Sequence, residues 1–260
     1  IRDPYAIYAR HILKLRPLDP LMRVPDALLR GTVLHEILEG FIRETLEHPT
    51  HCTHATLMHH AETVLAQNVP WAEARALWLA RLERVADWFI ETEFARRARA
   101  HPVAFEASGR ATLPDLGFTL SAKADRLDLD DLGQVHIYDY KTGAPPSAKE
   151  QTSFDKQLLL EAAIATRAGF ADMGPSRVAR AVFIGLGSPP KELDAPLGAE
   201  PPEKIWSEFH ALISAFFDPD MGYTSRRAPR NADEDGDYDQ LARYGEWDLT
   251  DTPQVTKVGQ

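Results

Sequence analysis

The spacing of hydrophobic residues along the chain changes several times between a helical and a strand pattern. Apolar residues every three or four positions are typical of helices with one buried face, whereas strict alternation with polar residues indicates strands. We expect helices at residues 4–15, 31–48, 54–66, 71–100, 155–167 and 203–217. We expect strands at residues 105–113, 117–130, 134–142 and 178–186, with proline-rich connections at 19–25 and 188–202.

These elements predict an α/β fold with a mixed β-sheet of about four or five strands flanked by helices. With 260 residues, of which 44% are hydrophobic, the chain is able to bury a full core. We expect a single domain over residues 1–260. Its parts are an N-terminal helix and connector (1–30), a core with an added helical region at about 50–100 (31–187), and a C-terminal helix and tail (188–260).

A turn-forming segment centred near Leu132 separates the two central strands and predicts a β-hairpin. In that register Leu127 faces Ile137, and Asp125 faces Asp139. Because side chains alternate between the two faces of a strand, both pairs lie on one face. The hairpin therefore places two acidic residues at the rim of a core face.

Facing acidic side chains, with Cβ atoms roughly 4.5–5.5 Å apart, repel each other. Either one carboxyl group keeps its proton through a raised pKa, or a cation lies between the oxygens. Lys141 lies two residues beyond Asp139 on the same face, beside whatever the acids hold. The spacing predicts a cation site with an adjacent ammonium group; the alternative is an ordinary hairpin with solvated Asp and Lys at its end.

Further polar residues are candidates for the same site. His35 lies on an amphipathic helix and is either a ligand or a core histidine, and Gly31, one turn earlier, would allow close approach of another backbone. Glu106 either supports the site, ligates a second metal ion, or is a plain edge-strand acid. Gln157 and Glu161 share one helix face, where Gln157 either bonds a phosphate oxygen or the backbone of the site, or is solvated.

Taken in order, these motifs resemble RecB-like nucleases, a branch of the PD-(D/E)XK superfamily. The N-terminal segment at residues 2–13 is most similar to the entry to the C-terminal nuclease domain of AddB-type helicase-nuclease subunits. The resemblance extends over about residues 1–247 and is carried by Gly31-x-x-x-His35, Glu106, residues 123–128, residues 139–143 and Gln157.

The resemblance implies a restriction-endonuclease-like core and a role for each matched residue. Lys141 matches the catalytic lysine, acting with Asp125 and Asp139, and Gln157 matches the glutamine that follows the active-site strands. Glu161 stands where the family often has tyrosine, and we expect Glu106, Gln157 and Glu161 to support the site or contact DNA. The implied metal ligands are His35, Asp125, Asp139 and the backbone carbonyl of Tyr140.

The implied cofactor is Mg²⁺, which prefers oxygen ligands, or Mn²⁺, which tolerates the imidazole of His35 better. Related AddB-type domains carry four cysteines for an iron–sulfur cluster, but Cys52 is the only cysteine here, so we expect no such cluster. We expect Asp3 or its neighbours and residues 225–239 to be held together instead by packing or hydrogen bonds.

The net charge of −10 is unusual for a DNA-binding protein, because phosphate contacts supply most of the affinity. Positive charge is clustered at residues 96–99 and 226–230, and the first cluster is either a helix cap or a DNA contact. We therefore expect weak, salt-sensitive binding, which suits a nuclease that receives its strand from a helicase.

The resemblance implies a Mg²⁺- or Mn²⁺-dependent exonuclease that acts on single DNA strands delivered from a duplex end, during double-strand-break processing and recombinational repair. It also implies a partner subunit of AddA type. The alternatives are a non-catalytic DNA-end-binding scaffold with the same fold and a free-standing RecB-like nuclease. The chain starts in mid-motif, which suggests part of a longer protein. With one cysteine, no apolar run of membrane-spanning length and no signal-peptide pattern, we expect a bacterial cytoplasmic protein without a membrane partner.

Overall fold

The computed structural model describes residues 2–18, 21–22, 24–228, 236–248, 250–254 and 256–257. The chain groups into two compact units, of which the larger is Val24–Ser207 and the smaller combines Ile1–Arg23 with Glu208–Gln260. All candidate site residues lie in the larger unit. The expectation of a single domain, with the three parts given above, stays a prediction.

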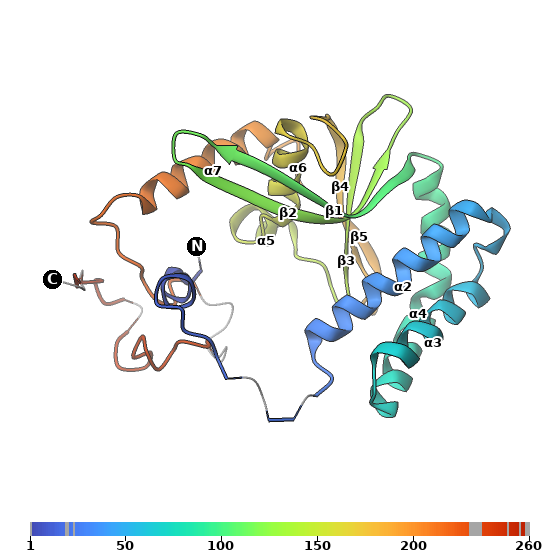
Figure 1. Cartoon of the computed structure of the whole chain (residues 1–260), viewed down its shortest axis with the longest axis horizontal. Helices are drawn as coiled ribbons and strands as arrows, with labels where there is room; N and C mark the ends of the chain where they lie inside the picture. The colour runs from blue at the N-terminus through green and yellow to red at the C-terminus, as the bar shows by residue number, and fades with distance from the viewer. Residues whose placement is uncertain are drawn as a thin grey trace. The chain divides into compact units, whose positions relative to one another are not determined.

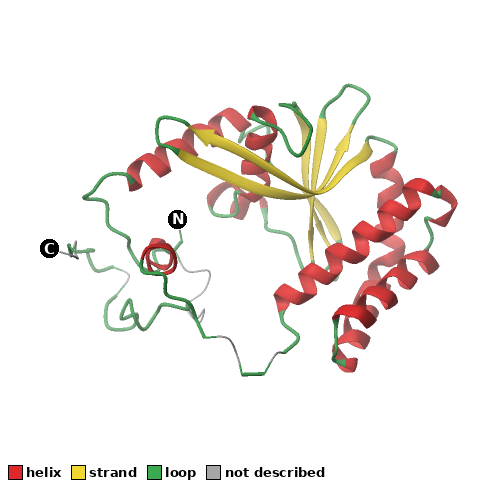
Figure 2. Cartoon of the chain, viewed as in Figure 1, coloured by secondary structure: helices red, strands yellow, loops and turns green. Residues whose placement is uncertain are grey.

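Most of the predicted elements are present, in the predicted order (Figures 1 and 2). The helices are α1 (Pro4–Ile7), continued by a π-helical segment (Tyr8–Ile12), α2 (Ala27–Glu47), α3 (His54–Asn68), α4 (Ala72–Arg97), α5 (Ala148–Ser153), α6 (Gln157–Arg167) and α7 (Pro202–Phe216). A short 3₁₀ helix at Pro49–His51 connects α2 to α3. The strands are β1 (His101–Leu113), β2 (Phe118–Leu129), β3 (Val135–Lys141), β4 (Val178–Gly185) and β5 (Lys191–Asp194).

The strands form one mixed sheet in the order β1-β2-β3-β4-β5. Strands β3 and β4 are parallel, and the other neighbours are antiparallel. In the β2–β3 hairpin Leu127 pairs with Ile137 and Leu129 with Val135, which confirms the predicted register. The expected mixed α/β sheet flanked by helices is therefore confirmed.

Three parts of the prediction were wrong. The expected loop at residues 188–202 contains the edge strand β5, which pairs with β4, for example Glu192 with Ile184. Strand β1 starts at His101, four residues earlier than expected, and helix α5 was not expected. A short polar segment such as β5 forms a strand because the edge of β4 supplies its hydrogen-bond partners, and local sequence does not encode that partner.

Both faces of the sheet are buried, whereas the hydrophobic pattern indicated one core face. Helix α6 packs across β1 to β4 on the face that contains Leu127 and Ile137. The opposite face, which includes Tyr138 and Tyr140, packs into the hydrophobic core formed with α2, α3 and α4. The helical region thus forms part of the main core, and it fixes α2 against the central strands.

Buried ion pairs connect the end of α4 to this second face. Arg126 lies 2.6 Å from Asp128 and 2.7 Å from Glu93, and all three side chains have no exposed surface. Arg96 is also fully buried, 3.0 Å from Glu93, and Arg97 donates to the same carboxylate. Arg96 is therefore neither a helix cap nor a DNA contact, because its charge is used inside the protein.

In the smaller unit, hydrogen bonds join the N-terminal and C-terminal segments, as expected. Asp3 Oδ1 accepts from the backbone N–H of Arg226 at 3.3 Å, and Tyr5 N–H donates to Thr224 O at 3.2 Å. The hydroxyl of Tyr238 donates to the carbonyl of Leu15 at 2.9 Å. Residues 229–235, with much of the predicted basic and acidic segments, and residues 19, 20 and 23 of the expected connector lie outside the described residues.

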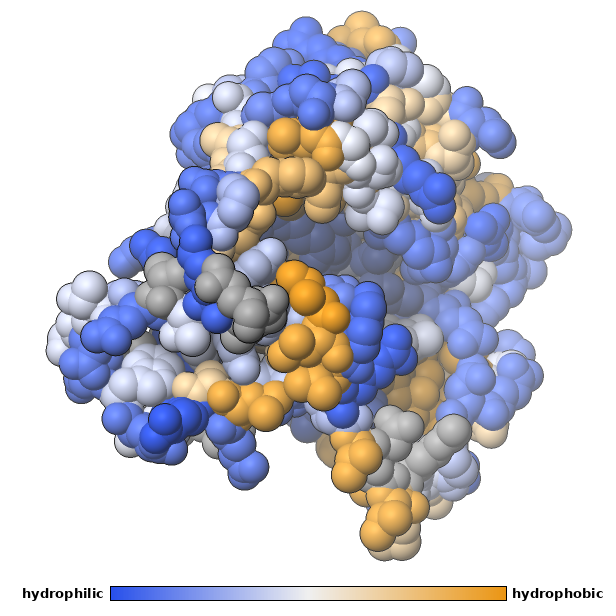
Figure 3. All heavy atoms as spheres, turned by 60° about the vertical axis from the view of Figure 1, so that its left-hand side comes forward, coloured by the Kyte–Doolittle hydropathy of each residue, from blue (hydrophilic) through white to orange (hydrophobic). Residues whose placement is uncertain are grey.

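The face of the molecule drawn in Figure 3 is largely hydrophilic, with several exposed hydrophobic residues. Leu18, Leu21 and Met22 in the smaller unit and Leu28 at the start of α2 are among the most exposed. Within the described part of the chain, no helix combines the length and the apolar character needed to cross a membrane.

Candidate active site

The N-terminal half of α2 places His35 against the end of the β2–β3 hairpin. Asp26 caps the helix by accepting from Leu29 N–H at 2.7 Å, and the apolar stripe around Ile37 is buried in the core. His35 Nε2 lies 2.9 Å from the carbonyl oxygen of Tyr140. Its Nδ1 lies 3.5 Å from Asp125 Oδ1 and 3.7 Å from a carboxylate oxygen of Glu106 on β1.

Gly31 does not have the role expected from its position one turn before His35. A Cβ atom at Gly31 would meet no atom within 4 Å, so no other backbone approaches this glycine closely. The helix is held against the strands by its larger side chains instead.

Three carboxylates form a row across three adjacent strands. Glu106 lies opposite Asp125, between the pairs Phe105–Arg126 and Ala107–Ala124. Asp125 in turn lies one position beyond the last β2–β3 pair, Arg126–Tyr138, so Asp139 is its neighbour on β3. The hairpin therefore brings Asp125 and Asp139 to one face, as the alternation predicted.

The side chain of Asp125 also accepts a backbone hydrogen bond from β3, in place of a backbone carbonyl of β2. Its Oδ2 accepts the backbone N–H of Tyr140 at 2.8 Å, where the regular β2–β3 pairing has just ended. This bond fixes the carboxylate and leaves Oδ1 facing His35. The backbone carbonyl of Tyr140 points to the same imidazole.

Glu106 has an unusual backbone, with φ at 50° in the middle of β1. This left-handed conformation is uncommon for residues other than glycine and costs on the order of 1 kcal/mol or more. One carboxylate oxygen lies near His35, and the other lies 2.5 Å from Lys123 Nζ. Strained residues of this kind are concentrated at functional sites, which favours a functional role for Glu106.

Lys141 is held by two side chains at the end of β3. Its Nζ lies 2.8 Å from Asp139 Oδ2 and donates to Gln157 Oε1 at 2.9 Å. The amide of Gln157, at the start of α6, donates to Asp139 Oδ1 at 2.5 Å. Gln157 is therefore bonded to the acid and the lysine, and the solvated alternative for this amide is wrong.

Glu161 lies one turn after Gln157 and is almost fully buried. Its Oε1 accepts from the amide of Gln157 at 3.2 Å, and among the described residues its buried Oε2 has no hydrogen-bond partner. Burial and the negative charge of Asp139 raise the pKa of Glu161 to about 8. At neutral pH this carboxyl group is therefore largely protonated.

The two aspartates of the row, Asp125 and Asp139, also have raised pKa values. Burial, reinforced by the negative charge of Asp139, raises the pKa of Asp125 to about 6. Burial raises the pKa of Asp139 as well, although the ammonium group of Lys141 opposes the shift. The raised pKa values reflect mainly the burial of two adjacent carboxylates, and a metal ion bound beside them would stabilise their ionised forms.

The donor atoms fit a divalent metal ion. Ligand atoms of His35, Glu106 and Asp125 all lie within 4.8 Å of one another, and the carbonyl of Tyr140 lies beside them. Asp139 adjoins this group but is bonded to Lys141 and Gln157. Several oxygens with one imidazole suit Mg²⁺ or Mn²⁺ better than a thiolate-preferring ion. That Asp125 and Asp139 ligate one common ion stays a prediction.

The hydrophobic pattern gave no role to Arg126 and Asp128, which lie on the other face of the same strand and support it through buried ion pairs. A signal was present, because charged residues two positions apart in a buried strand require partners. The partner, Glu93, lies 33 residues away along the chain and was not identifiable from the local pattern.

Comparison with known proteins agrees with this fold and site. Residues 3–247 match the PD-(D/E)XK nuclease superfamily, so the chain belongs to this superfamily, whose members are typically metal-dependent nucleases.

Three similar proteins are named only as uncharacterized proteins. One from Rickettsia bellii is 27% identical over 65% of this chain and 21% of its own length. One from Rickettsia conorii is 25% identical over the same shares, and one from Rickettsia typhi is 27% identical over 65% of this chain and 20% of its own length. The chain thus spans about a fifth of the length of these relatives.

Proposed function

We propose that this chain is a divalent-metal-dependent deoxyribonuclease that hydrolyses phosphodiester bonds. The observation that carries the proposal is the ammonium group of Lys141, held by Asp139 and Gln157 beside a row of carboxylates and an imidazole. A fixed cation in a partly buried site stabilises the negative charge that develops on a phosphoryl group. Membership of the superfamily supports the same chemistry.

We infer that His35, Asp125, Asp139 and the backbone carbonyl of Tyr140 hold the metal ion, and that Glu106 is a further ligand. Bound there, Mg²⁺ or Mn²⁺ would polarise the phosphoryl group and lower the pKa of a water molecule. Because an imidazole suits Mn²⁺ better than Mg²⁺, Mn²⁺ should support activity at least as well.

The residues around the metal site have separate tasks in this proposal. Lys141 donates a hydrogen bond to a phosphoryl oxygen or to the attacking water, and Gln157 limits the positions that its ammonium group can take. Asp125 is already fixed by Tyr140 N–H, so its free oxygen is oriented before any ligand binds. Preorganisation of this kind lowers the cost of reorganisation during the reaction.

We further propose that the domain acts as an exonuclease on DNA strands from a duplex end, within an AddAB-type helicase-nuclease with an AddA-type partner. The ordered motifs support this proposal, and so does the greater length of the Rickettsia relatives. The net charge of −10 also supports it, since a motor that delivers the strand makes high intrinsic affinity unnecessary. The proposed setting is double-strand-break repair in the bacterial cytoplasm.

The test compares labelled linear DNA with covalently closed circular DNA in Mg²⁺, Mn²⁺ or excess EDTA. The proposal predicts degradation of the linear substrate from its ends, dependence on the metal, and protection of the circle. Asp139→Asn should abolish degradation, while Lys191→Ala, a change at an exposed position on β5, should leave it unchanged. Binding of DNA ends without cleavage in any metal would instead favour a scaffold with the same fold.

A further inference from the structure

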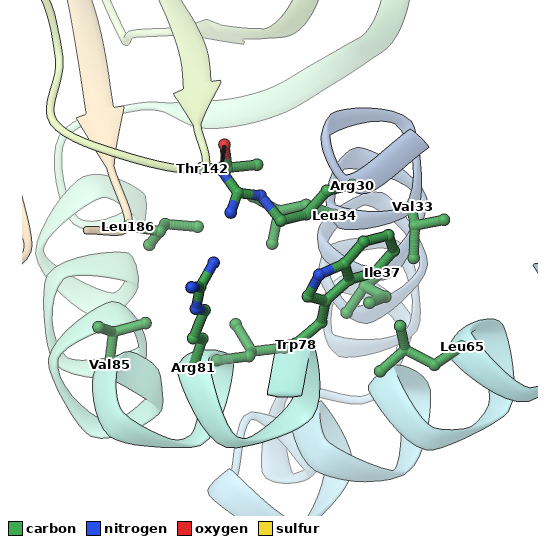
Figure 4. A pocket seen from close by; sticks show the side chains of 11 residues that line it. Arg30, Val33, Leu34, Ile37, Leu65, Trp78, Arg81, Val85, Thr142 and Leu186 are labelled. Carbon is green, nitrogen blue, oxygen red and sulfur yellow. Dashed lines mark hydrogen bonds between the residues drawn. The ribbon is translucent and has the colours of Figure 1, made fainter. Parts of the chain in front are cut away.

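A cleft opens beside the end of β3, between α2, α3 and α4. It is lined by residues of these helices together with Thr142 and Leu186, which follow the ends of β3 and β4 (Figure 4). Thr142 directly follows Lys141, so the cleft adjoins the candidate active site. Three of its lining residues, Arg30, Trp78 and Arg81, have no role in the site described above.

Arg30 comes from the same helix as His35 and also faces the end of β3. Its Nη2 donates to Thr142 Oγ1 at 2.9 Å, while His35 contacts the carbonyl of Tyr140 two residues earlier. Its buried Nε has no hydrogen-bond partner among the described residues. A buried guanidinium N–H without an acceptor is costly, and an anionic ligand in the cleft would satisfy it.

Arg81, on α4, is exposed, and its guanidinium group has no hydrogen bond or ion pair within the described part of the chain. In Figure 4 it points toward the ends of the strands, where Thr142 and Leu186 lie. The described lining contains two arginines and no acidic side chain. The cleft therefore differs from the chain as a whole, whose net charge is −10, and suits a phosphate.

Trp78 supplies an aromatic surface in the same cleft. It lies three residues before Arg81, which puts both side chains on one face of α4. The indole is only partly buried and packs against the hydrophobic core, so its position is fixed. Basic side chains next to an exposed aromatic ring are the combination with which proteins hold single-stranded nucleic acid, since phosphates pair with the cations and bases stack on the ring.

We propose that this cleft is a binding subsite for the single-stranded segment next to the scissile phosphate. Arg30 and Arg81 contact a phosphate, and a base stacks on Trp78. The subsite deepens the proposed nuclease function and rests on it, because the strand is taken to continue from the cleft to the metal site. A single strand is the occupant because stacking on Trp78 requires an unpaired base.

The experiment measures fluorescence anisotropy of a labelled oligothymidylate with the whole chain in Ca²⁺, and compares it with a duplex of the same length. Arg81→Gln should weaken single-strand binding about fivefold or more. It should also reduce the slope of log affinity against log salt concentration by about one, the change expected for one lost phosphate contact. Trp78→Leu should also weaken it about fivefold or more, while Trp78→Phe should retain most of the affinity. Duplex binding should change little.

Two matched variants serve as controls. Arg84→Gln removes the same charge from an exposed position one turn further along α4, and Trp88→Leu removes another partly buried indole of that helix. Both should bind the oligonucleotide like the parent chain if they retain its melting temperature. An abasic oligonucleotide should bind equally well to the parent and to Trp78→Leu.

Equal effects of Arg81→Gln and Arg84→Gln, or equal binding by Trp78→Leu and the parent, would overturn the subsite. This outcome is separate from a failure of the nuclease proposal, because binding in Ca²⁺ requires no hydrolysis. Cleavage with no effect of the cleft variants would refute the subsite alone. Tight, Trp78-dependent binding without cleavage in any metal would refute the nuclease and leave the subsite standing.

Discussion

Lys141 on β3 and Gln157 on α6 are joined by a hydrogen bond of 2.9 Å, and both contact the carboxylate of Asp139. The bond ties the proposed catalytic lysine to the helix that packs on the same face of the sheet. A long lysine side chain in solvent samples many rotamers, whereas here two polar partners fix its ammonium group. Gln157 is therefore a positioning residue for Lys141.

Replacing Gln157 with leucine should lower kcat about 10- to 100-fold and change KM little, because the loss of an outer partner misorients the groups that react. Steady-state rates on linear DNA at several substrate concentrations separate the two parameters. Gln157→Glu should recover part of the rate, since its carboxylate still accepts from Lys141. A purely structural role would instead lower the melting temperature of both variants and leave kcat per folded molecule unchanged. Gln240→Ala, at an exposed position, is the control.

Asp125→Asn should have opposite effects on thermal stability, relative to the parent, with and without metal. In EDTA at pH 8 the variant should melt at a higher temperature than the parent, because a buried carboxylate beside Asp139 is removed while the acceptor for Tyr140 N–H is kept. In Mn²⁺ the parent should be stabilised according to the concentration and Kd of the ion, and the variant should lose most of this gain. Thermal melts over a Mn²⁺ series measure both effects. An equal Mn²⁺ response in the two proteins would refute Asp125 as a ligand.

The metal-free protein should lose stability as the pH rises from about 4.5 to about 8. Glu161 ionises near 4.5 when unfolded and near 8 when folded, so in this range the folded state holds a proton that the unfolded state releases. The expected loss in the free energy of unfolding is about 2–4 kcal/mol. Glu161→Gln should flatten this pH dependence in urea denaturation with EDTA, whereas Glu203→Gln, at an exposed position, should not. The same slope in Glu161→Gln and the parent would contradict the raised pKa.

Glu93→Gln should destabilise the chain by about 3–5 kcal/mol. Glu93 carries the negative charge that Arg96 and Arg126 contact, and all three side chains are fully buried. Removing one partner leaves a buried positive charge without compensation. Urea denaturation against Glu91→Gln, at an exposed position of the same helix, measures the difference. A change below about 1 kcal/mol would show that the buried ion pairs do not hold α4 against the sheet.

The sequence was sufficient to predict the hairpin because its register depends on local features. The turn near Leu132 and the alternating pattern from Leu127 to Ile137 together allow one pairing that buries the apolar side chains. The same alternation places Asp125, Asp139 and Lys141 on one face. Helix α2 was predicted for a similar reason, since its apolar stripe repeats with the helical period.

Features that depend on distant partners were not predicted. Strand β5 forms against the edge of β4, and Arg96 is buried because the carboxylates of Glu93 and Glu192 pair with its charge. The left-handed backbone of Glu106, in the middle of β1, was not predicted either, because glutamate rarely adopts this conformation and the local sequence does not indicate it. The cleft at Trp78 combines three helices and two strand ends, so only the folded chain shows it.

The central claim is that Lys141 belongs to a hydrolytic metal site, and the rate of phosphodiester cleavage tests it most directly. The measurement is single-turnover degradation of end-labelled linear DNA in Mn²⁺ by the parent chain, Lys141→Ala and the control Lys191→Ala. The account predicts cleavage by the parent and the control, and a loss of about a hundredfold or more in Lys141→Ala, with its melting temperature retained. Cleavage by Lys141→Ala at the rate of the parent would contradict it.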